Sequence, residues 1–288
     1  MKTPRVSFEF FPPKSLEASF RLWDTIHALA PLGPRFVSVT YGAGGTTREL
    51  TREAVSTLHK ATGLNVAAHL TCVNASRAET LEIAGQFHDA GVREIVALRG
   101  DAPKGSDGFT PHPDGFADSC ELVAALAATG KFLIRVGAYP EKHPEAADTK
   151  ADIDWLKRKI DAGASEAITQ FFFEAETFFR FRDACAAAGI EAPIIPGILP
   201  IENWSGARKF AIACGTSIPP RIEDAFAEAI RDNRHDLLAT AVCTELCSAL
   251  IEGGVEDLHF YTLNRPELTR DVCHALGVTP GAALCEVA

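Results

Sequence analysis

Residues 65–100 read NVAAHLTCVNASRAETLEIAGQFHDAGVREIVALRG, and this stretch decides the fold. It opens with an apolar run, continues through a segment of helical character and closes with a second apolar run. Ser76 and Glu79 fit a capping box, in which two side chains satisfy backbone N–H groups that the first helical turn leaves free. Gly91 follows the helical segment, where a left-handed residue commonly ends a helix. The stretch therefore predicts two parallel strands joined by a helix.

The same unit recurs along the whole chain. We find eight β-rich runs, at 6–11, 36–42, 65–72, 94–100, 133–140, 167–173, 193–200 and 257–264. Most of them are nearly continuously apolar, as strands covered on both faces are. Thr46 with Glu49 fits a second capping box, and glycines stand near the ends of the helical segments, at Gly33, Gly63, Gly91, Gly130, Gly163 and Gly189.

Eight units at a spacing of roughly thirty residues suit a closed barrel better than an open sheet. The sequence therefore predicts an α/β fold, a (β/α)8 barrel. We expect an extra helix between the seventh and eighth strands, because 221–233 and 235–252 both have helical patterns. No low-complexity linker divides the chain, so residues 1–288 are expected to form a single domain.

Composition narrows the classes of function. The 288 residues carry a formal net charge of −10, which disfavours nucleic acid as a partner because phosphate binding needs a basic face. The eight cysteines form no CxxC pattern, and there is no HxH or HExxH, so we expect no metal and no disulfide framework. The apolar run in the first residues, MKTPRVSFEFF, is too short for a signal peptide or a membrane span. We therefore expect a cytoplasmic protein without a membrane partner.

A barrel of this kind has its active site where the carboxyl ends of the strands meet. Glu9 lies in the apolar run FEFFPP at such an end, and burial there is expected to raise the pKa of its carboxyl toward a value useful for proton transfer. Glu9 is therefore the best candidate for a general acid. A carboxylate turned outward to a lysine has similar weight on the residues alone, and the strand-end position favours the functional interpretation.

Other strand ends carry polar side chains as well. Gln170 offers a donor and an acceptor that suit a heterocycle, although most buried amides only satisfy neighbouring backbone groups. Arg99–Asp101, an RGD sequence, suits a phosphate and a ring, or else forms a surface ion pair. His69 and His143 are more often structural than ligand-binding, and DIDWLKRK at 152–159 suits a ribose and a pyrophosphate or a solvated helix face.

GAGGTT at 42–47 lacks the features of a dinucleotide-binding fingerprint. Thr47 stands where the third glycine is required, and no acidic residue marks the end of a following strand. Any flavin or nicotinamide is therefore expected to bind at the mouth of the barrel.

Taken in chain order, these motifs resemble the methylenetetrahydrofolate reductase family over nearly the whole sequence. The matching segments are FEFFPPK at 8–14, SVTYGAGG at 38–45, HLTC at 69–72, ALRGD at 97–101, AYPEKHPEA at 138–146, DAGASEAITQFFF at 161–173, IIPGILPI at 194–201 and HFYTLNR at 259–265. The resemblance is to the short bacterial form, without the regulatory domain of eukaryotic members. It implies a barrel that holds FAD noncovalently and forms a homo-oligomer.

The resemblance also implies the reaction. NADH or NADPH would reduce the flavin, which passes hydride to 5,10-methylenetetrahydrofolate in a ping-pong mechanism. The product, 5-methyltetrahydrofolate, supplies methyl groups for methionine synthesis. By resemblance Glu9 is the acid that opens the imidazolidine ring at N10, and Asp101 is the second catalytic residue.

Binding residues follow from the same resemblance, position by position. Asp101 and Gln170 match pterin contacts, Arg265 lies near the folate tail, and Phe210 packs on the nicotinamide or aminobenzoyl ring. Thr40 and Gln170 also match contacts of the nicotinamide nucleotide. The FAD contacts are Thr40, Tyr41, Ala43, His69, Arg99, Gly100, Asp101, Ser119, Tyr139, His143, Ala146, Asp152, Trp155, Arg158 and Lys159. Asp118 and Ser119 depart from the Tyr-Ala common in members, which weakens the assignment of Ser119.

Two other classes of function fit the residues. A lyase or aldolase barrel would use Glu9 and Asp101 as acid and base without flavin. A relative that binds folate or flavin without turnover is the non-enzymatic alternative, and the presence of Glu9, Asp101 and Gln170 together argues against it.

Overall fold

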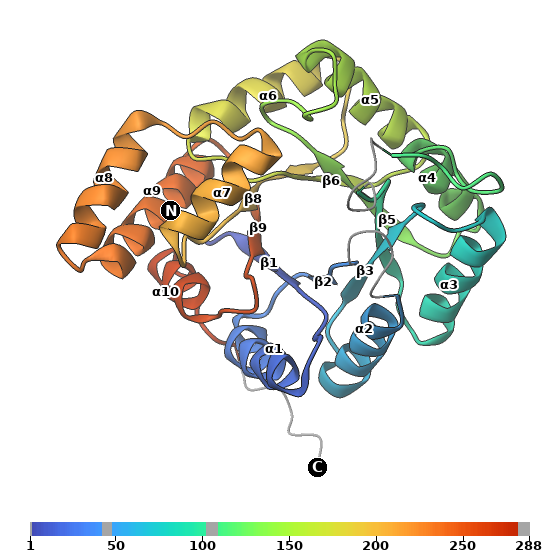
Figure 1. Ribbon diagram of the computed structural model, residues 1–288, viewed down its shortest axis with the longest axis horizontal. Helices are drawn as coiled ribbons and strands as arrows, with labels where there is room; N and C mark the ends of the chain where they lie inside the picture. Colours follow the sequence, from blue (N-terminus) through green and yellow to red (C-terminus); the bar gives the residue numbers. More distant parts are fainter. Residues whose placement is uncertain (1, 42–47, 102–108, 282–288) are drawn as a thin grey trace.

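The computed structural model describes residues 2–41, 48–101 and 109–281, and their strands form one parallel sheet that curves around a central axis. Figure 1 shows the strands as an inner ring and the helices outside it. Neighbouring strands follow the order β7-β6-β5-β4-β3-β2-β1-β9-β8. The predicted α/β barrel is confirmed. Ala43, Thr46 and the 42–47 motif lie outside the described residues.

The strands agree with the eight predicted runs except at the seventh. Their bounds are β1 Arg5–Phe10, β2 Val37–Val39, β3 Val66–Thr71, β4 Glu94–Leu98, β5 Leu133–Ala138, β6 Glu166–Thr169, β7 Ile194–Ile195, β8 Gly197–Ile198 and β9 Asp257–Tyr261. The seventh run is therefore two short strands separated by Pro196, which has no N–H to donate to a ladder. On one side of Pro196, β7 pairs with β6, and on the other β8 pairs with β9.

Side chains reinforce the junction at which β6 and β7 meet β8 and β9 and the barrel closes. The Tyr261 hydroxyl on β9 donates to the carbonyl of Thr169 on β6 at 2.6 Å, and the Gly197 N–H donates to the Thr169 hydroxyl at 2.9 Å. A Cβ atom on Gly197 would lie 2.1 Å from the Thr169 carbonyl oxygen, so only glycine fits there. The barrel thus closes through two short ladders and a tyrosine.

Helices cover the outside of the ring. They are α1 Leu16–Leu29, α2 Arg48–Thr62, α3 Arg77–Asp89, α4 Ser119–Ala128, α5 Thr149–Asp161, α6 Ala175–Ala187, α7 Trp204–Cys214, α8 Pro220–Arg231, α9 His235–Glu252 and α10 Glu267–Ala275, with a 3-10 turn at Ala30–Leu32. The two helical patterns predicted after the seventh strand are α8 and α9. The sequence analysis did not identify α7, which begins after the N-cap Asn203. No helix in the described parts of the chain has the length and apolar character needed to cross a membrane.

The predicted helix ends are confirmed where they can be seen. Ser76 and Glu79 form the capping box at the start of α3, with both reciprocal hydrogen bonds. All six glycines expected to end helical segments have positive φ, from 64° at Gly130 to 117° at Gly163. Local sequence therefore fixes where each helix stops and the next strand can start.

The apolar core has two parts. The larger lies between sheet and helices and includes Phe8 and Phe260, which are fully buried. A smaller cluster is formed by Phe36, Ala67, Val96, Ile168 and Ile195. Four of them lie on β3, β4, β6 and β7 and the fifth directly precedes β2, and they form a cluster separate from the larger one, as expected for side chains that fill the inside of a barrel.

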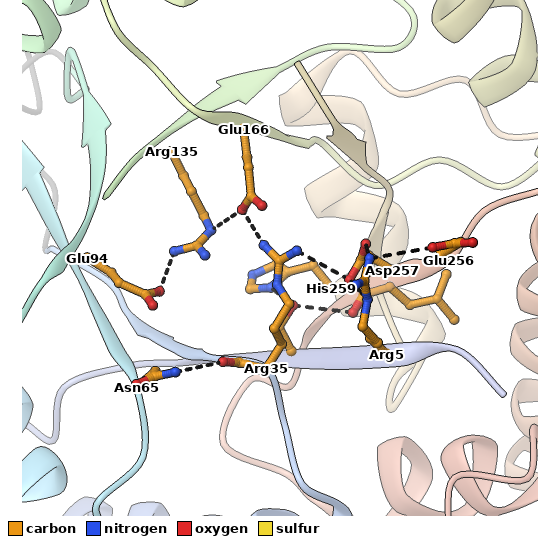
Figure 2. A network of polar contacts seen from close by, with 11 residues as sticks. Arg5, Arg35, Asn65, Glu94, Arg135, Glu166, Glu256, Asp257 and His259 are labelled. Atoms are coloured by element: carbon orange, nitrogen blue, oxygen red, sulfur yellow. Dashed lines mark hydrogen bonds and ion pairs between the residues drawn. The ribbon is translucent and has the colours of Figure 1, made fainter. Parts of the chain in front are cut away.

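Charged side chains form a network at the amino ends of the strands (Figure 2). Arg135 donates to Glu94 at 2.6 Å and to Glu166 at 2.7 Å, although only 2% of its side chain is exposed. Arg35 contacts Glu166 and Asp257, and Asp257 also binds Arg5 at 2.6 Å. Every charge in this network has a partner of opposite sign.

Candidate active site

Glu9 lies at the carboxyl end of β1, where two histidines face its carboxylate. The sheet register places Glu9 beside Ser38 on β2 and Tyr261 on β9. Oε2 of Glu9 lies 3.3 Å from Nε2 of His69 on β3 and 3.7 Å from Nε2 of His259 on β9. Its side chain is 16% exposed, so a ligand at the barrel mouth can reach it. The Glu9 side chain therefore faces the barrel mouth as predicted, and the alternative of a carboxylate turned outward to a lysine is wrong.

The prediction of a raised pKa for Glu9 is wrong. Burial does raise the pKa of this carboxyl, but hydrogen bonding and charge from His259 and His69 favour the ionised form and lower the pKa to about 2. Burial lowers the pKa of the His259 imidazole, which Glu9 opposes. Glu9 is thus an ionised carboxylate beside a buried histidine in the ligand-free protein at neutral pH.

Ser7 and His259 are residues of this site that sequence reasoning missed. The Ser7 hydroxyl lies 2.8 Å from Nδ1 of His259, and both side chains are buried. Phe36 stacks on the His259 ring at 5.4 Å between centroids. A sequence signal was present, because polar residues at alternate positions, 7 and 9 on one run and 259 and 261 on another, point to the same face of two strands.

A cavity of about 400 Å³ lies at the carboxyl ends of β4 and β5, between these strands and helices α4 and α5. We call it the flavin cavity, after the FAD contacts that the family resemblance predicts there. It gathers eight of the side chains predicted to contact FAD: Arg99, Ser119, Tyr139, His143, Ala146, Asp152, Trp155 and Lys159. Segments that lie about sixty residues apart thus converge on one concave site.

Arg99 is held at the rim of the flavin cavity. Its guanidinium makes a two-pronged ion pair with Glu145, with N–O distances of 2.5 and 2.9 Å. The guanidinium also lies over the ring of Phe109, 4.9 Å from the centroid. The suggested surface pair between Arg99 and Asp101 is absent among the described residues, and Asp101 is an exposed carboxylate. Glu145 could not be found from the sequence, because it lies 46 residues from its partner.

Lys159 is the buried cation of the flavin cavity. Its side chain comes from α5, and its ammonium donates to the carbonyl of Gly137 on β5. Burial lowers the pKa of Lys159 to about 8, while Asp152 and Cys120 act in the opposite direction. No ion pair joins Lys159 to a carboxylate within the described residues. A buried ammonium without a counter-ion favours an anionic ligand.

Aromatic and capping groups complete the wall of the flavin cavity. Tyr139 packs edge-on against His143 at 4.6 Å, and burial raises the pKa of its hydroxyl to about 12. The carboxylate of Asp152 accepts the backbone N–H of His143 at 2.8 Å. Asp118 caps α4 by accepting the N–H groups of Cys120 and Glu121. The departure from the family pattern at 118–119 therefore forms a helix cap, with Ser119 buried in the cavity wall.

A second cavity of about 430 Å³ lies across the barrel mouth, between β8, β9 and helix α7. We call it the tail cavity. Its lining includes Phe210 and Arg265, both predicted to bind substrate, together with Phe11, Glu202 and Leu263. Phe210 stacks on Phe171 at 5.1 Å and is 43% exposed. An exposed aromatic ring beside an arginine suits a flat ligand that ends in an anion.

A family model, described as methylenetetrahydrofolate reductase, matches residues 1–277. The chain belongs to this family. It is 45% identical over 279 residues to the 5,10-methylenetetrahydrofolate reductase of Pectobacterium carotovorum, covering 96% of this chain and 92% of that relative. It is 46% identical over 278 residues to the same enzyme of Escherichia coli, with the same coverage of both chains. The predicted family resemblance is confirmed.

A solved structure from Clostridium thermocellum has a similar fold. It is described as an uncharacterized protein that binds two copies of 5-methyl-5,6,7,8-tetrahydrofolic acid. It aligns with a TM-score of 0.60 and 16% sequence identity, covering 96% of this chain and 95% of that chain. At this identity the likeness concerns the barrel alone.

The remaining site residues expected from the methylenetetrahydrofolate reductase family line neither of these two cavities. Gln170 lines a small recess with Tyr139, and its amide oxygen accepts the N–H of Phe171 at 3.0 Å. Gly100 has a φ of 89°, and a Cβ there would lie 2.9 Å from Val73. The other members of this group are Thr40, Tyr41, His69, Asp101 and Arg158.

Arg158 does not line the flavin cavity; its guanidinium lies over the ring of Trp155, 4.4 Å from the centroid, and its side chain is exposed. No cluster of three histidine, cysteine, aspartate or glutamate side chains with metal-binding geometry occurs in residues 2–41, 48–101 or 109–281. The site is thus built from carboxylates, imidazoles, guanidinium groups and one buried ammonium.

Proposed function

We propose that this protein reduces 5,10-methylenetetrahydrofolate to 5-methyltetrahydrofolate with FAD as its cofactor and NADH or NADPH as the electron donor. The observation that carries the proposal is the convergence of eight expected FAD contacts on one cavity that contains a buried cation without a counter-ion. Membership of the family supports the reaction. Bound FAD would accept hydride from the nicotinamide and return it to the folate, which makes the kinetics ping-pong.

The residues of the flavin cavity fit a dinucleotide. Lys159 offers a desolvated ammonium to a pyrophosphate, and Trp155 and Tyr139 offer flat surfaces to rings. Arg99, already fixed by Glu145, can hold a phosphate or polarise a ring without further loss of side-chain freedom. Asp152 is positioned by its bond to His143 and can accept ribose hydroxyls. The wall of the cavity therefore supplies both charge and stacking.

Folate is expected to occupy the space between the two cavities. Asp101 and Gln170 would bind the pterin, Phe210 would pack on the aminobenzoyl ring, and Arg265 would bind the glutamate tail. Arg265 makes no ion pair among the described residues, so its guanidinium is available to a ligand carboxylate. Thr40 and Gln170 would contact the nicotinamide, which would bind at the same place as folate in the other half-reaction.

Glu9 has to gain a proton before it can act as an acid. Its pKa of about 2 in the ligand-free protein means that the resting carboxylate is ionised. A ligand that covers the barrel mouth removes the remaining water from Glu9, and this desolvation raises the carboxyl pKa. The proton would then pass from Glu9 to N10 of the folate and open the imidazolidine ring. His69 and His259 hold Oε2 in place for this transfer.

Two half-reactions test the proposal in stopped-flow experiments. We expect the purified protein to be yellow, NADH or NADPH to bleach it without folate, and methylenetetrahydrofolate to restore the colour. A colourless protein that acts on its substrate without flavin would overturn the proposal in favour of a lyase or aldolase. We place this activity in a cytoplasmic homo-oligomer that supplies methyl groups for methionine synthesis.

The variant Glu9→Gln separates the acid from the rest of the site. It keeps the shape of the side chain but cannot supply a proton, so we expect flavin reduction by NADH at the wild-type rate. Reoxidation by methylenetetrahydrofolate should slow about 10²- to 10⁴-fold, the contribution of a positioned general acid. Asp24→Asn is the matched control, because Asp24 lies on the outer helix α1 away from both cavities. Normal folate turnover in Glu9→Gln would show that Glu9 is not the acid of the reaction.

A further inference from the structure

Glu202 is a carboxylate in the tail cavity that the proposed reaction does not use. It lies just before Asn203, the N-cap of α7, and lines the cavity together with Phe210 and Arg265. Its Oε1 atom is buried and has no hydrogen-bond partner in the described structure. A buried carboxylate oxygen without a partner loses hydration without a compensating hydrogen bond, so a ligand that supplies a donor to Oε1 would stabilise it.

The surroundings of Glu202 favour a neutral donor over a second anion. Burial raises the pKa of the Glu202 carboxyl, and Glu267 on α10 and Asp236 on α9 add to the rise. Arg265 and a backbone hydrogen bond from Leu268 lower it and favour the ionised form. A ligand carboxylate placed against Glu202 would add another negative charge to this group. An N–H group would satisfy Oε1 without that repulsion.

We propose that Glu202 determines specificity for the tail of folate by accepting the N–H of the amide that joins the aminobenzoyl group to glutamate. This inference rests on the proposed function, since it requires folate in the tail cavity. In that arrangement Phe210 faces the aminobenzoyl ring, Glu202 takes the amide N–H, and Arg265 takes a carboxylate beyond the amide. The three side chains offer an apolar surface, an acceptor and a donor, one for each of the three groups that the tail presents.

Three variants distinguish an acceptor from a charge. Glu202→Ala removes the acceptor, Glu202→Gln keeps an acceptor oxygen without the charge, and Glu267→Gln removes a nearby charge from an exposed residue outside the cavity lining. In each protein, NADH reduces the flavin and stopped-flow absorbance follows reoxidation at increasing methylenetetrahydrofolate concentration. This gives an apparent Kd for folate and a limiting rate.

We expect Glu202→Ala to raise the apparent Kd about tenfold, as the loss of one hydrogen bond to a charged group does, with the limiting rate unchanged. Glu202→Gln should stay within about threefold of the wild type, and Glu267→Gln should behave as the wild type. Reduction by NADH should be the same in all four proteins, which shows that each is folded and loaded with flavin. An unchanged Kd in Glu202→Ala overturns the inference. Equal losses of affinity larger than about threefold in Glu202→Gln and Glu267→Gln also overturn it, because charge alone would then be responsible.

A shortened substrate provides the second arm. Methylenetetrahydropteroate ends in a carboxylate where folate has the amide, so it offers Glu202 no N–H. We expect Glu202→Ala to bind this analogue no more weakly than the wild type does. A tenfold loss for the analogue as well would show that residue 202 acts only through the shape of the cavity. If methylenetetrahydrofolate fails to reoxidise the wild-type protein, the proposed function fails first, and that result differs from an unchanged Kd in the variant.

Discussion

At the amino end of the barrel Arg135 lies between Glu94 and Glu166, whereas at the carboxyl end Lys159 bonds, among the described residues, to a backbone carbonyl and to no carboxylate. Both cations are buried, with 2% and 7% of the residue exposed. The first is neutralised on both sides and the second is not. Arg135 therefore needs no further partner, whereas the charge of Lys159 still needs an anion to neutralise it.

Other groups follow the same division. The network of Figure 2 pairs Arg35 and Arg5 with acids at the strand starts. At the strand ends and the loops beyond them, Thr71 Oγ1 and Glu202 Oε1 are buried without a partner. A single sheet thus separates stability from function along its strands, because loops at only one end are free to bind a ligand. Removing the buried cation at each end should consequently have opposite effects on the free energy of unfolding.

The largest effect is expected from Arg135→Met. This change leaves Glu94 and Glu166 without their shared buried partner, which should lower the free energy of unfolding by about 3–5 kcal/mol. Urea unfolding followed by circular dichroism measures it. The control is Arg231→Met, because Arg231 is exposed and pairs only with its neighbour Asp232. A loss below about 1 kcal/mol for Arg135→Met would show that the network contributes little to stability.

Lys159→Met should raise the free energy of unfolding of the apoprotein, which is the opposite of the effect expected for Arg135→Met. Because burial lowers the Lys159 pKa from 10.5 to about 8, holding the charged form costs the folded state up to about 3 kcal/mol below pH 8. Removing the charge should raise stability at pH 7, and the gain should shrink between pH 8 and 10.5, where the unfolded wild type holds a proton that the folded one has released. Affinity for FAD should fall about tenfold or more.

Lys157→Met serves as the matched control for this helix, because Lys157 is partly exposed and bonds to Asp161 at 2.9 Å. It should change neither FAD affinity nor stability by more than about 0.5 kcal/mol. Apoprotein unfolding across pH and fluorescence titration with FAD give the two quantities. If Lys159→Met instead destabilises the apoprotein and binds FAD normally, the ammonium is structural and the contrast between the two ends fails.

The smallest effect concerns acid stability at the carboxyl end. The folded-state pKa of Glu9 is about 2 against a reference of 4.5, so Glu9 contributes stability above pH 4.5 that is lost as the pH falls toward 2. Glu9→Gln lacks this contribution. We expect the difference in unfolding free energy between the two proteins to be constant above pH 4.5 and to narrow below it. A difference that grows as the pH falls would mean that the folded state raises the pKa of Glu9.

Local sequence predicted the parts of the fold that depend on neighbouring residues. The capping box of Ser76 and Glu79 and the left-handed glycines are settled within a few positions, and all were found. Pro196 was visible too, but its effect on the seventh strand requires knowledge that both its neighbours pair in the sheet. Helix α7 was missed because it is short, Trp204–Cys214, and contains Gly206, which has a low helix propensity.

The site was harder to predict where distant partners set the chemistry. Strand-end reasoning located Glu9, yet its pKa depends on His69 and His259, which lie 60 and 250 positions further along the chain. Burial can be inferred from an apolar run, but the partners that offset it cannot. The same holds for Arg99, whose pairing with Glu145 needs the β5 loop to fold back over β4.

The pairing of β1 with β9 has a consequence for the order in which the protein is made. Arg5 lies opposite Asp257, and Glu9 lies opposite Tyr261, so β1 has to wait for a strand that is synthesised about 250 residues later. Joining ends so far apart in the chain is slow, since loop-closure entropy opposes it. Until then Glu9 has no His259 beside it. The proton donor of the proposed reaction is therefore synthesised long before the strand that completes its surroundings.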